Sequence, residues 1–244
     1  MGVVYIGDRN TGKTHLAMEL ANPHNENVKV SSPDYENLRR LLYDDKLQGT
    51  RATDAKKEVD NRELEIQVRL PTGYRTINID WIDTPGEVWR KSWQGDNPKK
   101  WKNFLDTVGS SKGIVLILPP YRNIISNPNV DAKEFLTRQQ WCNRFNRWVD
   151  FFKNDCSQAR RVVICLNKAD LFCDIDKEAA LLNRKNWQER HSYVLQKYFK
   201  PIQPQIEQFN KIMARSSVSC FITSIYNRKL LELPWLYLGT FLSY

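Results

Sequence analysis

The sequence predicts an α/β fold in which a mostly parallel β-sheet lies between two layers of helices. Short runs of apolar, β-branched residues recur along the chain with longer amphipathic stretches between them, which is typical of buried parallel strands joined by helices. These runs are residues 3–6, 113–118, 162–166 and 220–223. Residues 64–70 instead alternate strictly between apolar and polar side chains, which indicates a strand with one face exposed to water.

A phosphate-binding loop is predicted after the first strand. Residues 7–14 match the pattern Gly-x-x-x-x-Gly-Lys-Thr, and Leu16 and Leu20 then open a helical face. The glycines let the backbone wrap so that successive N–H groups point at phosphate oxygens, and the start of the helix adds its dipole. Lys13 should reach the terminal phosphates, and the Thr14 hydroxyl should bind Mg²⁺. The residues predicted to line the nucleotide here are Asn10, Thr11, Gly12, Lys13, Thr14 and His15.

The next segment, residues 22–60, has no clear sheet pattern. Within it, residues 35–47 are predicted to form an extra helix, opened by the Ser-Ser-Pro run before it. A turn at residues 71–73 then joins the alternating strand at 64–70 to a second strand at 75–82. We therefore expect a β-hairpin at the edge of the sheet.

Polar residues follow two of the predicted strands at their carboxyl ends, where ligands of open α/β sheets bind. Asp83 can hold the Mg²⁺ shell through water, and the Gly86 N–H can meet a γ-phosphate. Asn167-Lys168-Ala169-Asp170 follows the strand at 162–166. The Asp170 carboxylate can accept two hydrogen bonds from the N1–H and 2-amino groups of guanine, whereas adenine offers neither donor. The wrong base would leave buried groups unpaired, so these residues predict selection of guanine.

Buried packing is predicted for two further sets of residues. Four aromatic residues at helical spacing form one apolar stripe, which indicates core packing and not a cofactor site. They are Trp141, Phe145, Trp148 and Phe152. The five cysteines are odd in number and show no Cys-x-x-Cys spacing, so we expect reduced thiols, with Cys165 and Cys220 in the core.

The three polar clusters occur in order, each at the end of a predicted strand, and in this the chain resembles the P-loop GTPases of the translation-factor-related class, in particular the Ras-like G domain. The resemblance implies one three-layer domain over residues 1–244, with a mostly parallel six-stranded sheet and one antiparallel edge strand. It implies that the Ser224 backbone N–H touches the guanine carbonyl. Ile225 replaces the Lys usually found there, which favours the backbone of Ser224 over a side-chain role.

The resemblance also implies two switch segments. The first lies within the insertion at residues 22–60 and needs a Thr that closes on Mg²⁺ and the γ-phosphate. Thr50 and Thr53 are the candidates, and Thr53 is favoured because it lies nearer the strand that should follow. The second switch covers residues 83–102. The length of the insertion is where the chain departs most from the family.

Slow hydrolysis of GTP is predicted from the residue after Gly86. Ras-like proteins have Gln at this position to orient the attacking water, and here it is Glu87, whose charge would oppose the γ-phosphate oxygens. Arg9 and Arg51 either supply positive charge to the reaction or are solvated side chains. The residues assigned to the chemistry are Lys13, Thr53, Gly86 and Glu87.

The charge of +9 suits an acidic partner but does not require nucleic acid. Basic residues interleave with Trp89, Trp93 and Trp101 around the second switch, where a nucleotide-gated protein interface is favoured over internal packing and over nucleic acid. The chain has no run of 18 apolar residues and no lipidation signal, so we expect a cytoplasmic protein without a membrane anchor. Its oligomeric state is left open.

The predicted function is a switch that binds GTP or GDP with Mg²⁺, hydrolyses GTP slowly and gates the binding of an effector or regulatory protein. The alternative is a catalytically weak interaction subunit that keeps the nucleotide as a structural ligand. An ATP-using kinase or ATPase would require the pattern at residues 167–170 to be accidental.

Overall fold

The protein is described by a computed structural model. It describes residues 2–8, 10–22, 27–44, 49–50, 60–83, 91–155, 161–212 and 217–242. Several residues singled out by the sequence lie outside these ranges, so the predictions made for them remain predictions. They are Arg9, Arg51, Thr53, Gly86, Glu87 and Trp89.

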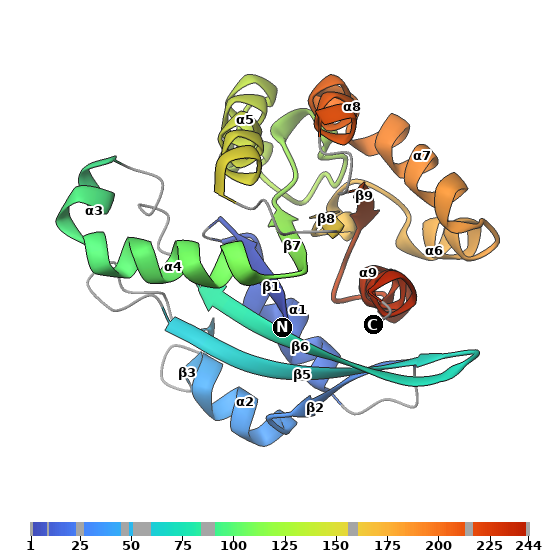
Figure 1. The fold of residues 1–244 in the computed structure, drawn as a ribbon. Helices are drawn as coiled ribbons and strands as arrows, with labels where there is room; N and C mark the ends of the chain where they lie inside the picture. The colour runs from blue at the N-terminus through green and yellow to red at the C-terminus, as the bar shows by residue number, and fades with distance from the viewer. Residues whose placement is uncertain are drawn as a thin grey trace.

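A seven-stranded sheet forms the centre of the molecule, with the strand order β2-β5-β6-β1-β7-β8-β9 (Figure 1). The strands β6, β1, β7, β8 and β9 are parallel, and β5 runs antiparallel to both of its neighbours. A separate two-stranded ribbon pairs β3 with β4. The bounds are β1 Val3–Gly7, β2 Val28–Ser32, β3 Tyr43–Asp44, β4 Gly49–Thr50, β5 Asp60–Leu70, β6 Gly73–Asp83, β7 Gly113–Leu118, β8 Arg161–Leu166 and β9 Ser217–Ile222.

The predicted α/β class is confirmed. Six neighbouring strands of the sheet have the mostly parallel arrangement expected of a Ras-like P-loop domain, in the order β5-β6-β1-β7-β8-β9. The prediction of six strands is wrong by one. The additional strand β2 lies within the segment at 22–60 and pairs with β5, so the hairpin of β5 and β6 is not at the edge of the sheet. Only Val28 and Val30 of β2 are buried hydrophobic residues, which is too short a signal to distinguish a strand from a loop.

The helices complete the outer layers, with α4 and α5 on one face of the sheet and α1 and α9 on the other (Figure 1). Four short 3₁₀ helices lie in the connections within the described residues. The α-helices are α1 Lys13–Ala21, α2 Tyr35–Leu42, α3 Lys91–Asp96, α4 Pro98–Ser110, α5 Arg138–Asp155, α6 Ile175–Asn183, α7 Trp187–Tyr198, α8 Gln203–Ile212 and α9 Arg228–Phe241. The 3₁₀ helices are η1 Arg122–Ile124, η2 Ala132–Glu134, η3 Ala169–Leu171 and η4 Lys200–Ile202.

The extra helix predicted at residues 35–47 is present as α2 but ends earlier, at Leu42, where β3 begins. Its first turn is capped by Asp34, whose Oδ1 accepts a hydrogen bond from the Asn37 N–H at 2.8 Å. The cap is therefore Asp34 and not a residue of the Ser-Ser-Pro run before it, because the Asp carboxylate satisfies an N–H that the helix leaves unpaired.

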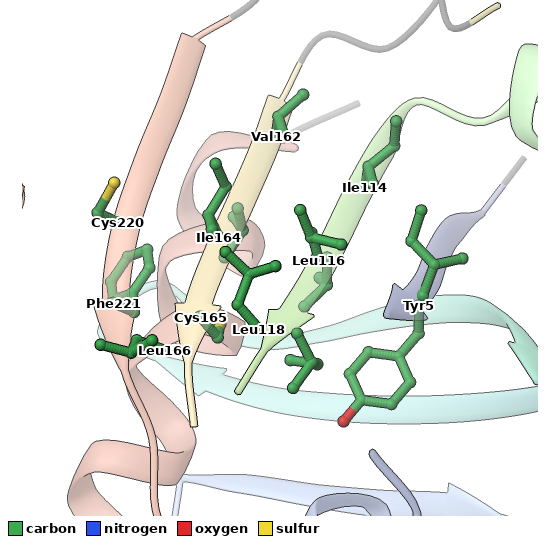
Figure 2. Close-up of a cluster of buried hydrophobic side chains, with 14 of the residues drawn as sticks. Tyr5, Ile114, Leu116, Leu118, Val162, Ile164, Cys165, Leu166, Cys220 and Phe221 are labelled. Atoms are coloured by element: carbon green, nitrogen blue, oxygen red, sulfur yellow. The ribbon is translucent and has the colours of Figure 1, made fainter. Parts of the chain in front are cut away.

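The core lies on both sides of β1, β7 and β8, whose central residues are buried. The aromatic stripe predicted on α5 is confirmed, since Trp141, Phe145, Trp148 and Phe152 are each 2% exposed. The predicted burial of Cys165 and Cys220 is also confirmed. Figure 2 shows their side chains among the aliphatic residues of the parallel strands.

The outer edge of β9 is protected by side chains from two helices. The Val218 N–H donates to Asn210 Oδ1 of α8 at 2.8 Å, and the Cys220 N–H donates to His191 Nδ1 of α7 at 3.0 Å. Burial lowers the pKa of His191, which favours the neutral ring that can accept this bond. The two side chains satisfy N–H groups that an open sheet edge would leave available for pairing with another chain.

A buried ion pair on α9 holds the end of α1 and the start of β2. Glu232, which is 2% exposed, accepts from the Arg228 Nε and from the Val28 N–H, both at 3.1 Å. Arg228 also donates to the carbonyl oxygens of Leu20 at 3.2 Å, of Val28 at 2.6 Å, and of Glu19. A cation at the carboxyl end of α1 is favourable for the helix dipole, so this pair fixes the helix that follows the phosphate loop.

Candidate nucleotide-binding site

The loop between β1 and α1 has the backbone of a phosphate cradle. Asn10 and Gly12 adopt positive φ angles of 61° and 86°, and alternation of this kind turns successive N–H groups toward one side. A Cβ on Gly7 would lie 2.4 Å from the Ile117 carbonyl oxygen, and one on Gly12 would lie 2.6 Å from Asn167 Nδ2. Glycine is therefore required at both positions by close contacts and, at Gly12, also by its backbone conformation.

Side chains of the loop hold it in this shape. Lys13 is 5% exposed, and its Nζ donates to the carbonyl oxygens of Gly7 at 2.8 Å and Asp8 at 2.9 Å. Thr11 is fully buried, and its Oγ1 donates to the same Asp8 oxygen at 2.9 Å. Gly12, which precedes α1, has no side chain to cap the helix, and the start of a helix is where an anion binds. The loop therefore fits a phosphate group.

An acidic residue inside the loop is paired with helix α5. The Asp8 side chain is 7% exposed, and its Oδ2 lies 3.3 Å from Nη1 of Arg144. Burial raises the pKa of Asp8, while the positive charges of Arg144 and Lys13 oppose that rise. Sequence reasoning missed this pair, because its two members are far apart in the chain.

Asn167 joins the loop after β8 to the phosphate loop. Its Nδ2 donates to the Thr11 carbonyl at 2.8 Å, and its Oδ1 accepts from the Thr223 hydroxyl at 3.1 Å. Asn167 is 3% exposed, so both bonds are made away from water. The first and last of the predicted clusters are therefore parts of one site, and the residue after β9 belongs to it.

Asp170 is oriented by the turn after β9. Its Oδ1 accepts a hydrogen bond from the Ser224 hydroxyl at 2.5 Å, and Ser224 is completely buried. The Ser224 oxygen in turn accepts from the Tyr226 N–H at 3.2 Å. The side chain of Ser224 thus has a positioning role that the sequence pattern, which favoured its backbone, did not assign.

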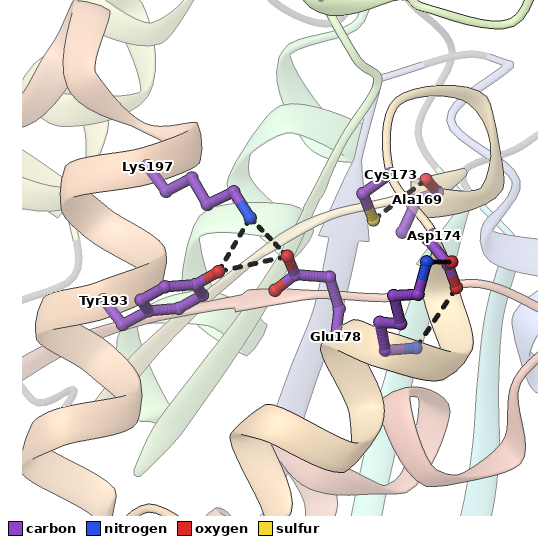
Figure 3. Close-up of polar contacts among 7 residues, drawn as sticks. Ala169, Cys173, Asp174, Glu178, Tyr193 and Lys197 are labelled. Carbon is purple, nitrogen blue, oxygen red and sulfur yellow. Dashed lines mark hydrogen bonds and ion pairs between the residues drawn. The ribbon is translucent and has the colours of Figure 1, made fainter.

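A polar cluster around the buried Glu178 supports the loop that carries Asp170 (Figure 3). The Cys173 thiol donates to the Ala169 carbonyl at 3.3 Å, and burial raises the pKa of Cys173 to about 11, so the thiol keeps its proton at neutral pH. Glu178 of α6 accepts from the Tyr193 hydroxyl at 3.0 Å and pairs with Lys197 of α7. These contacts fix the helices on which the loop rests.

The remaining predicted site residues lie around this centre. Thr14 and His15 are in the first turn of α1, and Lys168 has a left-handed backbone with a φ of 61°. Partial burial and the nearby charge of Lys168 lower the pKa of His15. Asp83 ends β6, which is paired in parallel with β1, so its backbone lies at the same edge of the sheet as the phosphate loop.

Within the described ranges, no group of three or more His, Cys, Asp and Glu residues could hold a metal ion by itself. Mg²⁺ is usually bound by one or two protein ligands together with substrate phosphates. Thr14 lies in the first turn of α1, and the backbone of Asp83 ends the neighbouring strand, where the structure does not describe its side chain. Binding of Mg²⁺ by these two residues therefore stays a prediction. Thr50 lies in β4, where the structure does not describe its side chain.

Trp101, in the segment predicted as a partner interface, is partly buried and packs against the core. Its ring stacks on Phe104 with the centroids 5.4 Å apart and lies 6.4 Å from the ring of Phe151 on α5. Part of the side chain stays exposed, so the interface interpretation remains a prediction for this tryptophan. The side chain of Trp93 lies outside the described residues.

In the parts of the chain that the structure describes, no helix has both the length and the apolar character needed to span a membrane.

The chain matches no model of a known protein family and none of the curated proteins. The solved structures that align with it include three that each cover at least nine-tenths of this chain. The Arl6 (BBS3) small GTPase of Trypanosoma brucei with a bound nucleotide analogue is 9% identical, with 98% of this chain and 95% of that chain covered and a TM-score of 0.45. The signal recognition particle receptor complex of SRb with GTP and SRX from Chaetomium thermophilum is 14% identical, with 98% and 99% covered and a TM-score of 0.42.

The Era protein of Aquifex aeolicus, bound to GDP and aluminium fluoride, is 13% identical, with 90% of this chain and 50% of that chain covered and a TM-score of 0.37. All three TM-scores are below 0.5, so these similarities carry no argument about activity.

Proposed function

We propose that this chain is a P-loop GTPase: a single G domain that binds GTP and GDP with Mg²⁺, hydrolyses GTP slowly and changes its affinity for a partner protein with the state of the nucleotide. The observation that carries the proposal is the position of Asn167, whose amide bonds the phosphate loop while Asp170, three residues later, presents a carboxylate oriented by Ser224. This arrangement supports a site in which phosphate binding and guanine recognition are joined.

Each side of the site has a distinct task. The N–H groups at the start of α1 and the ammonium of Lys13 would neutralise the phosphates, and the hydrogen bonds of Lys13 to the loop carbonyls hold its charge in place. Asp170 would accept the N1–H and 2-amino hydrogen atoms of guanine. Thr14 and Asp83 would hold Mg²⁺, which when bound neutralises charge that develops on the phosphates.

Slow turnover follows from the chemistry expected of Glu87. A carboxylate near the γ-phosphate repels the phosphate oxygens, although it can still accept a hydrogen bond from the attacking water. Thr53 and Gly86 would contact the γ-phosphate in the GTP state only, so the segments that carry them would change between states. The affinity of a partner that binds these segments would then depend on whether GTP or GDP is bound.

The experiment is to identify the nucleotide released by denaturing the purified protein and to measure phosphate release from added GTP. We expect bound guanine nucleotide, slow phosphate release from GTP, and loss of both with Lys13→Ala. Glu87→Gln should accelerate phosphate release if the charge of Glu87 limits the rate. Bound GTP with no phosphate release would favour the alternative, an interaction subunit that holds GTP as a structural ligand. Bound ATP would contradict the proposal.

A further inference from the structure

The connection between β7 and α5, residues 119–137, is held against the loop that carries Asp170. It contains η1 and η2. The N–H groups of Ser126 and Asn127 both donate to the carbonyl oxygen of Leu171, at 3.0 and 3.1 Å. Leu171 ends η3 and is the residue after Asp170. Two backbone hydrogen bonds therefore tie the connection directly to the base-recognition loop, residues 167–171.

The two ends of the connection are also held together. The Arg122 N–H donates to the Leu136 carbonyl at 2.8 Å, which brings the two ends of the connection together. The Trp141 Nε1 of α5 donates to the Pro119 carbonyl at 2.9 Å, and the rings of Tyr121 and Trp141 lie 4.9 Å apart. Because Trp141 is buried in the core, the connection is a compact loop anchored at both ends.

Phe135 of this connection presents its ring to Lys168. The Lys168 Nζ lies 5.9 Å from the centroid of the Phe135 ring, within the range of a cation–π contact. Lys168 also interacts electrostatically with His15 in the first turn of α1. The Lys168 side chain therefore contacts the connection and lies near enough to the first turn of α1 to influence His15.

We propose that residues 119–137 form a clasp that holds the base-recognition loop on bound guanine nucleotide and slows nucleotide release, with Phe135 as a positioning residue that acts through Lys168. The inference rests on the proposed function. Release of the base requires the loop with Asp170 to move away from it, and the two bonds to Leu171 oppose that movement. The clasp acts on the base side of the site, so it sets the lifetime of the complex and not the hydrolytic step.

The test is the rate at which a fluorescent GDP analogue leaves the protein after excess unlabelled GDP is added. Phe135→Ala and Phe135→Leu remove the aromatic face, and Phe135→Tyr retains it. We expect the first two variants to release the analogue faster by about 3- to 10-fold, and the Tyr variant to match the wild type. In a Lys168→Met background, Phe135→Ala should have no further effect, because its target is already absent.

Tyr74→Ala is the matched control, since Tyr74 is 68% exposed at the tip of the β5–β6 hairpin and should not change release. Amide exchange provides a readout that needs no substitution: the Ser126 and Asn127 amides should exchange more slowly with GDP bound than without it. Unchanged release from Phe135→Ala and Phe135→Leu, or an equal acceleration in the Lys168→Met background, would overturn the clasp alone. Failure of the wild type to bind the GDP analogue would contradict the proposed function and the clasp together.

Discussion

Replacing Asn167 with Ala should both destabilise the protein and weaken nucleotide binding, because the Asn167 side chain makes buried hydrogen bonds and also holds the phosphate loop. The substitution removes the bond from Asn167 Nδ2 to the Thr11 carbonyl and the bond from the Thr223 hydroxyl to Asn167 Oδ1. Leaving a buried polar group without its partner costs about 1–3 kcal/mol. The Thr223 hydroxyl can rotate toward another acceptor, so its cost lies at the low end, and the expected total is about 2–4 kcal/mol.

Thr223→Val is the matched control, because it keeps the shape of the side chain and removes only one of the two bonds. It should cost about 1–2 kcal/mol, less than Asn167→Ala. Urea unfolding followed by tryptophan fluorescence measures both changes, provided that the slopes of the transitions agree. In the same proteins, the affinity for GDP should fall by at least about tenfold with Asn167→Ala, since the carbonyl of the phosphate loop loses its partner.

Unfolding of Asn167→Ala within about 0.5 kcal/mol of the wild type, a change typical of an ordinary surface substitution, would refute this role of Asn167. So would a variant that lost stability but bound GDP as tightly as the wild type. In that case Asn167 would be a structural residue of the sheet edge and not the link between the two parts of one site.

Three further predictions concern charge and hydrogen bonding. Arg144→Ala should cost about 1 kcal/mol in urea unfolding, a modest value because Arg144 is 43% exposed, and combining it with Asp8→Asn should recover most of that loss. Asp170→Asn should weaken GDP binding in a calorimetric titration and improve the binding of xanthosine diphosphate, because the amide can donate to the 2-oxo group of xanthine; stronger GDP binding would contradict this. The lowered pKa of His191 means that the unfolded chain binds more protons, so the free energy of unfolding should fall as pH drops below about 6.5. His191→Gln keeps an acceptor that does not titrate, and an equal pH dependence in this variant would exclude His191 as the cause.

The phosphate loop and the parallel strands could be predicted because their signals are local. The first strand is apolar at successive positions because it is buried on both faces. Gly7 and Gly12 are required by close contacts with Ile117 and Asn167 and, at Gly12, by a positive φ. The aromatic stripe on α5 could be predicted for the same reason, since the helical repeat alone places its aromatic residues on one face.

The features that sequence reasoning missed depend on contacts between distant segments. Strand β2 has only two buried hydrophobic residues, and it becomes a strand by pairing with β5 and by the hydrogen bond of the Val28 N–H to Glu232. The contact of Asn167 with Thr11 joins residues that are 156 positions apart. Asp8, a charged residue directly after Gly7, pairs with Arg144, and nothing in the sequence around Asp8 identifies this partner.

The most direct test of the account is an equilibrium competition between GDP and ADP for the purified protein in the presence of Mg²⁺. The Asp170 carboxylate, which accepts a hydrogen bond from Ser224, would accept the N1–H and 2-amino hydrogen bonds of guanine, and adenine has neither of these donors. We predict that GDP binds more tightly than ADP by at least about a hundredfold. Equal affinities, or tighter binding of ADP, would show that this is not a guanine-nucleotide site.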